Sequence, residues 1–123
     1  METERVGKIV LDSAFKVHSG LGPGLLESVY EACLAYEIRR NDILVETQVL
    51  LPVFYQGISV EAGLRLDLFV DNCVLVEIKS VEKWNQLYEA QLLTYLKMSG
   101  VRLGYIINFN VFRLKEGIKR MVL

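Results

Sequence analysis

Two acidic side chains and a lysine near the middle of the sequence have the chemistry to act together on a phosphodiester. Asp67 lies in one short apolar stretch, and Glu77 and Lys79 lie in the next one along the chain. Two carboxylates held close together repel unless a cation or a proton lies between them. Magnesium suits such a pair, since it takes oxygen ligands and binds through one or two carboxylates together with substrate phosphate. A neighbouring ammonium would stabilise a metal-activated hydroxide or the charge that builds on phosphorus.

The two stretches alternate like the strands of a hairpin, and their register decides whether the acids meet. A two-residue turn would send Asp67 and Glu77 to opposite faces, whereas a three-residue loop at 71–73 sets them directly across from each other. In that register the Cβ atoms of the two acids would lie about 5 Å apart. The same register gathers one wholly apolar face, which we expect to be buried: Leu64, Leu66, Leu68, Val70, Val74, Val76 and Ile78. Hydrophobic burial therefore favours the arrangement that brings the carboxylates together.

Three further polar side chains are candidates for the same site. Gln91 and Tyr95 are four residues apart and share one face of a predicted helix, where an amide and a phenol could reach a phosphate or the lysine. Glu27 directly follows a glycine- and proline-rich break at the start of another predicted helix. Each has an ordinary alternative, because a helix flank meets water and a first-turn acid is favoured by the helix dipole. The Glu-x-Lys pattern likewise also occurs in ordinary half-exposed strands.

The elements that must position these residues are predicted from the spacing of apolar residues and from turn signals. Their order, α-α-β-β-β-α-β-β, predicts an α/β fold in one domain over residues 1–123, with a mixed central sheet flanked by helices. Pro52 inside the first strand suggests an edge strand or a break. The predicted helices are Glu4–Ser19, Leu26–Arg40 and Val81–Ser99, and the predicted strands are Val45–Tyr55, Leu64–Val70, Val74–Lys79, Leu103–Phe109 and Ile118–Leu123.

Composition limits the classes of protein to which the chain can belong. It has 123 residues, of which 52% are hydrophobic and 24% charged, which excludes a disordered or low-complexity chain. No apolar run approaches the roughly 20 residues that span a bilayer, so no membrane segment is expected. Two cysteines and no secretory signal favour a cytoplasmic protein. The net charge of -1 argues against a protein that binds nucleic acid mainly through a large positive charge.

The ordered motifs resemble a known family of nucleases. Gly24-Leu25-Leu26-Glu27-Ser28-Val29-Tyr30 resembles the signature of the GxxExxY proteins. Asp67, then Glu77-Ile78-Lys79, then Gln91-Leu92-Leu93-Thr94-Tyr95 resemble the motif series of the PD-(D/E)XK nuclease superfamily, especially its RecB-like exonuclease branch. The likeness extends from about Val6 to Val122. Two positions depart from the pattern, since Leu66 replaces the usual proline and Tyr88 stands where many relatives have histidine.

The resemblance implies a restriction-endonuclease-like core and a nuclease that depends on Mg2+ (or Mn2+). By position in the motifs, Asp67 and Glu77 would be metal ligands, with the Ile78 carbonyl as a third oxygen, and Lys79 would be the catalytic lysine. Glu27 would lie near the metal or its water. The residues expected to contact substrate are Gln91, Tyr95 and, unless it is a helix packing residue, Tyr30.

Three functions remain open from the sequence. The first is a metal-dependent nuclease, with DNA favoured over RNA as substrate by analogy with the family. The second is a non-catalytic module that keeps the fold and binds nucleic acid or protein, and the third is a structural or oligomerising domain. The intact set of Asp67, Glu77 and Lys79 favours the nuclease, because a binding module has no need to hold two repelling acids together. A domain this small is also expected to form a homo-oligomer or to use a partner to span a duplex.

Overall fold

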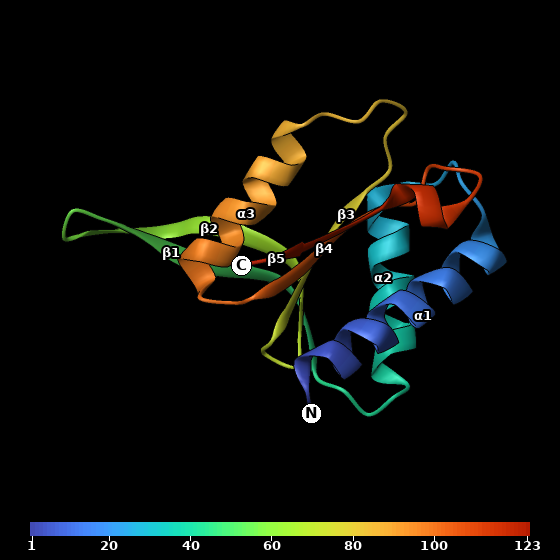
Figure 1. The fold of residues 1–123 in the computed structure, drawn as a ribbon, viewed down its shortest axis with the longest axis horizontal. Coiled ribbons are helices and arrows are strands. Elements are labelled where there is room, and N and C mark those ends of the chain that lie inside the picture. Colours follow the sequence, from blue (N-terminus) through green and yellow to red (C-terminus); the bar gives the residue numbers. More distant parts are fainter.

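The computed structural model describes residues 1–123 as a five-stranded mixed sheet with helices on both faces (Figure 1). The strands lie in the sheet in their order along the chain; β3 and β4 are parallel and the other neighbours antiparallel. This confirms the predicted α/β class. The elements are α1 (Thr3–Leu21), α2 (Glu27–Arg39), β1 (Val45–Tyr55), β2 (Ile58–Val70), β3 (Val74–Lys79), α3 (Leu87–Ser99), β4 (Leu103–Asn108), a short 3-10 helix η1 (Leu114–Gly117) and β5 (Ile118–Val122).

The prediction for the third helix is wrong at its start. Helix α3 begins at Leu87 and not at Val81, because residues 81–86 form a loop between β3 and the helix. The side chain of Asn108, at the end of β4, accepts a hydrogen bond from the Val81 N–H at 3.1 Å and donates one to the Val81 carbonyl at 3.0 Å. These bonds hold the main chain of Val81 at the end of β4, where it cannot also begin a helix.

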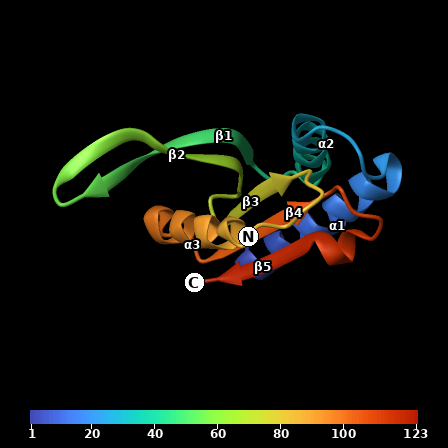
Figure 2. The same ribbon diagram turned by 90° about the horizontal axis from the view of Figure 1, so that it is seen from above.

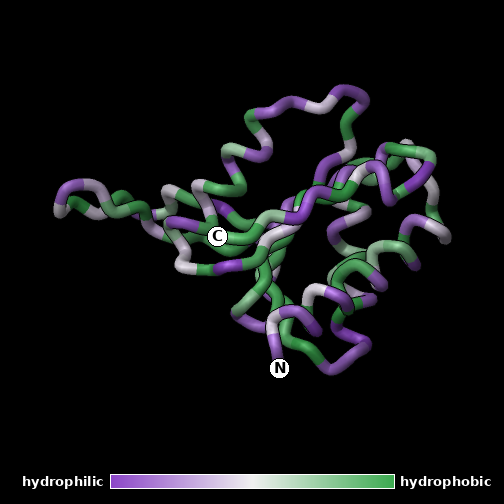
Figure 3. Tube along the Cα trace, viewed as in Figure 1, coloured by the Kyte–Doolittle hydropathy of each residue, from purple (hydrophilic) through white to green (hydrophobic).

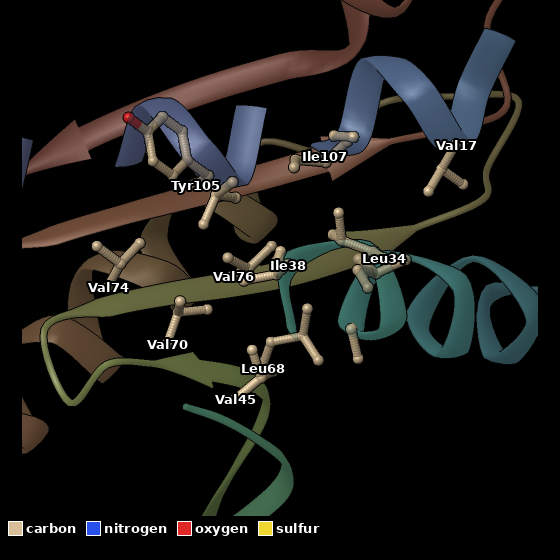
Figure 4. Packing of buried hydrophobic residues seen from close by; sticks show 14 of the residues in the cluster. Val17, Leu34, Ile38, Val45, Leu68, Val70, Val74, Val76, Tyr105 and Ile107 are labelled. Atoms are coloured by element: carbon tan, nitrogen blue, oxygen red, sulfur yellow. The ribbon is translucent and has the colours of Figure 1, made fainter. Parts of the chain in front are cut away.

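The larger part of the core lies between the sheet and helices α1 and α2. It contains 20 buried residues, and Figure 4 shows Leu34 and Ile38 of α2 facing Leu68 and Val76 of the strands. Apolar side chains at successive inward positions of β2, β3 and β4 pack against apolar stripes of the two helices. This face of the sheet is closed.

Helix α3 covers the opposite face with a smaller cluster. It contains six buried residues: Leu66, Leu75, Leu92, Leu96, Val101 and Ile106. Figure 2 shows α3 below the β1–β2 hairpin, which extends past the helix and away from α1 and α2. Polar and apolar segments alternate along this hairpin (Figure 3), and Leu50, Phe54, Tyr55, Ile58 and Val60 are exposed on it.

The β1–β2 hairpin bears out the expectation for Pro52. Strand β1 is an edge strand, and its register with β2 shifts between Leu51 and Val53. Proline has no N–H to donate to a ladder, so it is tolerated at an edge or at such an irregularity.

Cys33 and Cys73 are both free thiols. None of the helices combines the length and apolar character that crossing a membrane requires.

The prediction of a single apolar face along β2 is wrong at its beginning. Leu68 packs in the larger cluster, whereas Leu66, two residues earlier, packs in the smaller one under α3. The hairpin changes faces between these residues. Leu66 pairs with Val49 and Leu68 with Thr47, while Gln48 between them has a left-handed backbone with φ 51°. The pairing of β1 with β2 therefore continues without a shift at this position. The side chains nearer the tip of the hairpin, such as Leu66, lie on the side of the sheet that α3 covers.

Candidate active site

The predicted register between β2 and β3 is confirmed. Val70 pairs with Val74 across a three-residue loop, and Leu68 pairs with Val76. Continued by one residue, this register sets Asp67 opposite Glu77. The Asp67 N–H donates to Glu77 Oε1 at 3.3 Å, and the Ile78 N–H donates to Asp67 Oδ2 at 2.8 Å. The two carboxylates therefore meet where the ladder of β2 and β3 ends.

The Glu77 carboxyl group is held in an unfavourable setting for a negative charge. Its side chain is buried, with a relative exposure of 6%. Burial, followed by the negative charge of Asp67, raises the pKa of Glu77 to about 8, while the positive charge of Lys79 acts in the opposite direction. At neutral pH the protein without metal therefore keeps a proton on this pair. A divalent cation is the other species that relieves the repulsion, so the chemistry of the donors fits a metal ion.

Lys79 lies beside the acid pair and under the beginning of α3. Its Nζ is 4.4 Å from the centre of the Tyr88 ring, a cation–π contact. Tyr88 in turn contacts Trp84 edge to face, with ring centres 5.3 Å apart. A groove of about 480 Å³ opens here, lined by Lys79, Asn85, Leu87, Tyr88, Ala90, Gln91 and Thr94. The lysine head group is thus both near Glu77 and at the wall of an open groove.

Gln91 and Tyr95 extend the site along α3. Gln91 Nε2 donates to the Tyr95 hydroxyl at 3.0 Å, so the predicted pair lies on one face of the helix. The pKa of Tyr95 is raised, chiefly by burial and then by the charges of Glu77 and Asp67. The phenol therefore lies within electrostatic reach of the acid pair, and Gln91 connects it to the groove.

Glu27 does not join the acid pair. It begins α2 and its side chain is exposed. No three side chains of His, Cys, Asp or Glu gather anywhere in the structure in a way that would hold a metal ion. A metal bound by Asp67 and Glu77 would therefore draw its other ligands from main-chain oxygen, water and substrate.

Tyr30 lies in the core, which is the packing alternative stated for it above. It is fully buried and stacks on Phe109, with ring centres 4.5 Å apart. Its hydroxyl donates to the Gly22 carbonyl at 2.6 Å and accepts from the Leu25 N–H at 3.1 Å. Tyr30 thus fixes the loop that leads into α2, and we assign it no contact with substrate.

Two side chains that the sequence did not single out lie at the site. Gln48 Nε2 donates to Asp67 Oδ1 at 3.4 Å and also to Glu31 Oε1 of α2. Burial raises the pKa of Glu31, and the charge of Asp67 contributes in the same direction. The spacing gave one signal for Glu31, which lies one helical turn after Glu27. Nothing in the sequence marked Gln48.

An α/β domain that holds two carboxylates and a lysine at the end of a mixed sheet has the architecture of a restriction-endonuclease-like protein. Sequence comparison agrees: a sequence model of the PD-(D/E)XK nuclease superfamily matches residues 4–121. The chain belongs to this superfamily, whose nucleases generally use divalent metal ions. No curated protein and no solved structure gives a significant match.

Proposed function

We propose that this chain is a nuclease that depends on Mg2+ (or Mn2+) and hydrolyses phosphodiester bonds in DNA. The observation that carries the proposal is the meeting of Asp67 and Glu77, with Lys79 beside them at an open groove. Membership of a nuclease superfamily supports the hydrolytic reaction. The motif around Glu27 supports the finer assignment to GxxExxY proteins of the RecB-like branch.

Asp67 and Glu77 would hold the metal ion together with the Ile78 carbonyl. The Ile78 N–H points to Asp67, and in a strand the N–H and C=O of one residue face the same neighbour, so this carbonyl faces β2 as well. A carboxylate pair with one carbonyl leaves positions for water and for substrate phosphate, as magnesium requires. Glu27 is exposed and lies one helical turn before Glu31, so it would act on the metal through a water.

The side chains around the metal ion would have separate roles in hydrolysis. A bound divalent ion supplies Lewis acidity toward phosphate and a more acidic water. The Lys79 ammonium would stabilise the negative charge on the phosphoryl oxygens while the water oxygen bonds to phosphorus and the bond to the ester oxygen breaks; the water gives up a proton to solvent, and the leaving oxygen takes one up from solvent. Gln91, on the wall of the groove, and Tyr95, whose hydroxyl accepts from the Gln91 amide, orient the phosphate through their amide and hydroxyl groups.

One observation favours a second function, a non-catalytic module that binds nucleic acid or protein. The net charge of -1 is low for a protein that must hold a polyanion by itself.

A homo-oligomer would enlarge the contact with a duplex, and the exposed apolar residues of the β1–β2 hairpin support self-association. The two free cysteines support a cytoplasmic location.

Cleavage and metal binding, measured separately, test this proposal. Labelled single- and double-stranded DNA and RNA are incubated with Mg2+, Mn2+ or chelator. We expect metal-dependent cleavage of DNA, and a Tm that rises with Mn2+ by mass action. Asp67→Ala and Glu77→Ala should abolish both effects. Lys79→Ala should keep the Tm shift and lose cleavage.

A matched control is Glu61→Ala, which removes an exposed acid from the hairpin, away from the site. It should cleave and bind Mn2+ as the wild type does. A wild-type protein that binds nucleic acid but never cleaves it would support the binding module instead. Normal cleavage by Lys79→Ala would show that the role assigned to the lysine is wrong.

A further inference from the structure

The backbone of Gln48 is in an unfavourable conformation for its residue type. It has φ 51° in the middle of β1, although its neighbours Thr47 and Val49 both pair with β2. Left-handed backbone is rare outside glycine and short polar residues, and a glutamine held there must be fixed by its surroundings. Such outliers gather at functional sites, where they deliver a particular side chain.

The side chain of Gln48 reaches two acids from different elements. Its amide nitrogen donates to Asp67 Oδ1 on β2 at 3.4 Å and to Glu31 Oε1 on α2. A glutamine amide has two N–H donors, so both are used by carboxylates. Glu31 therefore anchors the amide that faces Asp67.

Both oxygens of Asp67 are then fixed by the chain. Oδ2 accepts from the Ile78 main-chain N–H at 2.8 Å, and Oδ1 accepts from Gln48. The first bond belongs to the junction of β2 and β3, whereas the second depends on one side chain of the edge strand. Without Gln48, the Asp67 carboxylate keeps one donor and can rotate about it.

We propose that Gln48, held by Glu31, is a positioning residue that sets the Asp67 carboxylate for metal binding. The left-handed turn in β1 brings its amide to Asp67. This inference rests on the proposed function, because it takes Asp67 and Glu77 to be the metal ligands. Groups that orient a metal ligand through a hydrogen bond typically change metal affinity by about 10–100-fold when they are removed.

The test uses two substitutions that suit a left-handed backbone but lose the amide contact. Gln48→Asn retains an amide on a side chain that is one methylene shorter, and Gln48→Gly has no side chain. We expect both metal-free variants to fold, and to bind Mn2+ about 10–100-fold more weakly by titration calorimetry. Glu31→Ala should weaken Mn2+ binding in the same direction but less, since it removes only the anchor.

Ala62→Gly is the matched control for the backbone. Ala62 lies in the same hairpin with φ 54°, is exposed, and brings no polar group to the site. Its Tm change measures the contribution of a left-handed backbone alone, and its Mn2+ affinity should equal that of the wild type. A similar Tm change in Gln48→Gly, together with weaker Mn2+ binding, separates positioning from folding.

The possible outcomes are distinct. Wild-type Mn2+ affinity in both Gln48→Asn and Gln48→Gly would overturn the positioning role and leave the nuclease proposal intact. A wild-type protein whose Mn2+ binding is absent, or is unchanged by Glu77→Ala, would overturn both proposals. Weaker binding in Ala62→Gly would also overturn the role of Gln48, because it would assign the effect to hairpin geometry.

Discussion

The two faces of the sheet differ in what they bury. The face under α1 and α2 buries 20 residues in one closed cluster, whereas the face under α3 buries six and ends in the groove beside Lys79. On β3, Val76 lies in the closed cluster, whereas its neighbour Glu77 points to the α3 face and is a buried acid there.

One face of the sheet therefore supplies most of the folding stability, and the other face carries the candidate active site. The closed face gains the hydrophobic free energy that holds the strands in register. The α3 face can then carry an acid pair whose burial without a cation is unfavourable. Substitutions on the first face should therefore change the free energy of unfolding, and substitutions on the second should change metal binding.

The largest expected effect on stability is at Leu34, in the middle of the closed face. Its side chain is fully buried in the larger cluster. Leu34→Ala should reduce the free energy of unfolding by about 2–5 kcal/mol, because the cavity fills only partly. Chemical denaturation measures this loss, and calorimetry with Mn2+ on the folded protein should show unchanged affinity. A large loss of metal affinity would show that the two faces are not independent.

The next effect is the pH dependence of the metal-free protein. The folded pKa of Glu77, about 8, lies above its ordinary value, so the favourable contribution of its protonated form is complete at low pH and is lost as pH rises toward 8. The free energy of unfolding should fall with pH between about 5 and 8, by up to about 1.4 kcal/mol per unit. Glu77→Gln should remove this slope and be the more stable protein at pH 8. Parallel slopes for the two proteins would assign the dependence to another group.

Metal affinity should change with pH in the opposite sense. The ion must displace the proton on Glu77, so Mn2+ affinity should rise up to about tenfold per pH unit and level off above about pH 8. Calorimetry in buffers of different ionisation enthalpy should show about one proton released per ion near neutral pH. Binding without proton release would contradict the raised pKa.

The smallest of these effects tests Tyr30. Its hydroxyl holds the loop between α1 and α2 through Gly22 and Leu25. Tyr30→Phe should lower stability by about 1–2 kcal/mol, since it leaves those main-chain groups without this partner. Mn2+ affinity and the KM for DNA should remain those of the wild type. A raised KM would restore Tyr30 as a substrate contact.

Local patterns predicted most of the fold. The helical spacing of Val6, Val10 and Val17 and the alternation along β3 lead directly to the observed elements. The strand prediction from Val45 to Tyr55 coincides with β1. The start of α3 was missed because Asn108, 27 residues later in the chain, holds the main chain of Val81 at the end of β4. The helix propensity of residues 81–86 contains no information about a hydrogen-bond partner so far along the chain.

The sequence by itself determined that Asp67 and Glu77 would face each other. A three-residue loop between the two apolar runs pairs Val70 with Val74 and places both acids on one side, and burial of Leu68, Val70, Val74 and Val76 favours this register over that of a two-residue turn. That argument is local, since it needs only the period of a strand and the length of a loop.

Only the tertiary structure decided what surrounds the pair. Gln48, Glu31 and Asp67 come from three elements and meet because the hairpin changes faces at a left-handed residue. Tyr30 is removed from the surface by stacking on Phe109, far along the chain. Contacts between distant segments depend on how whole elements pack, and neither residue type nor spacing specifies that packing.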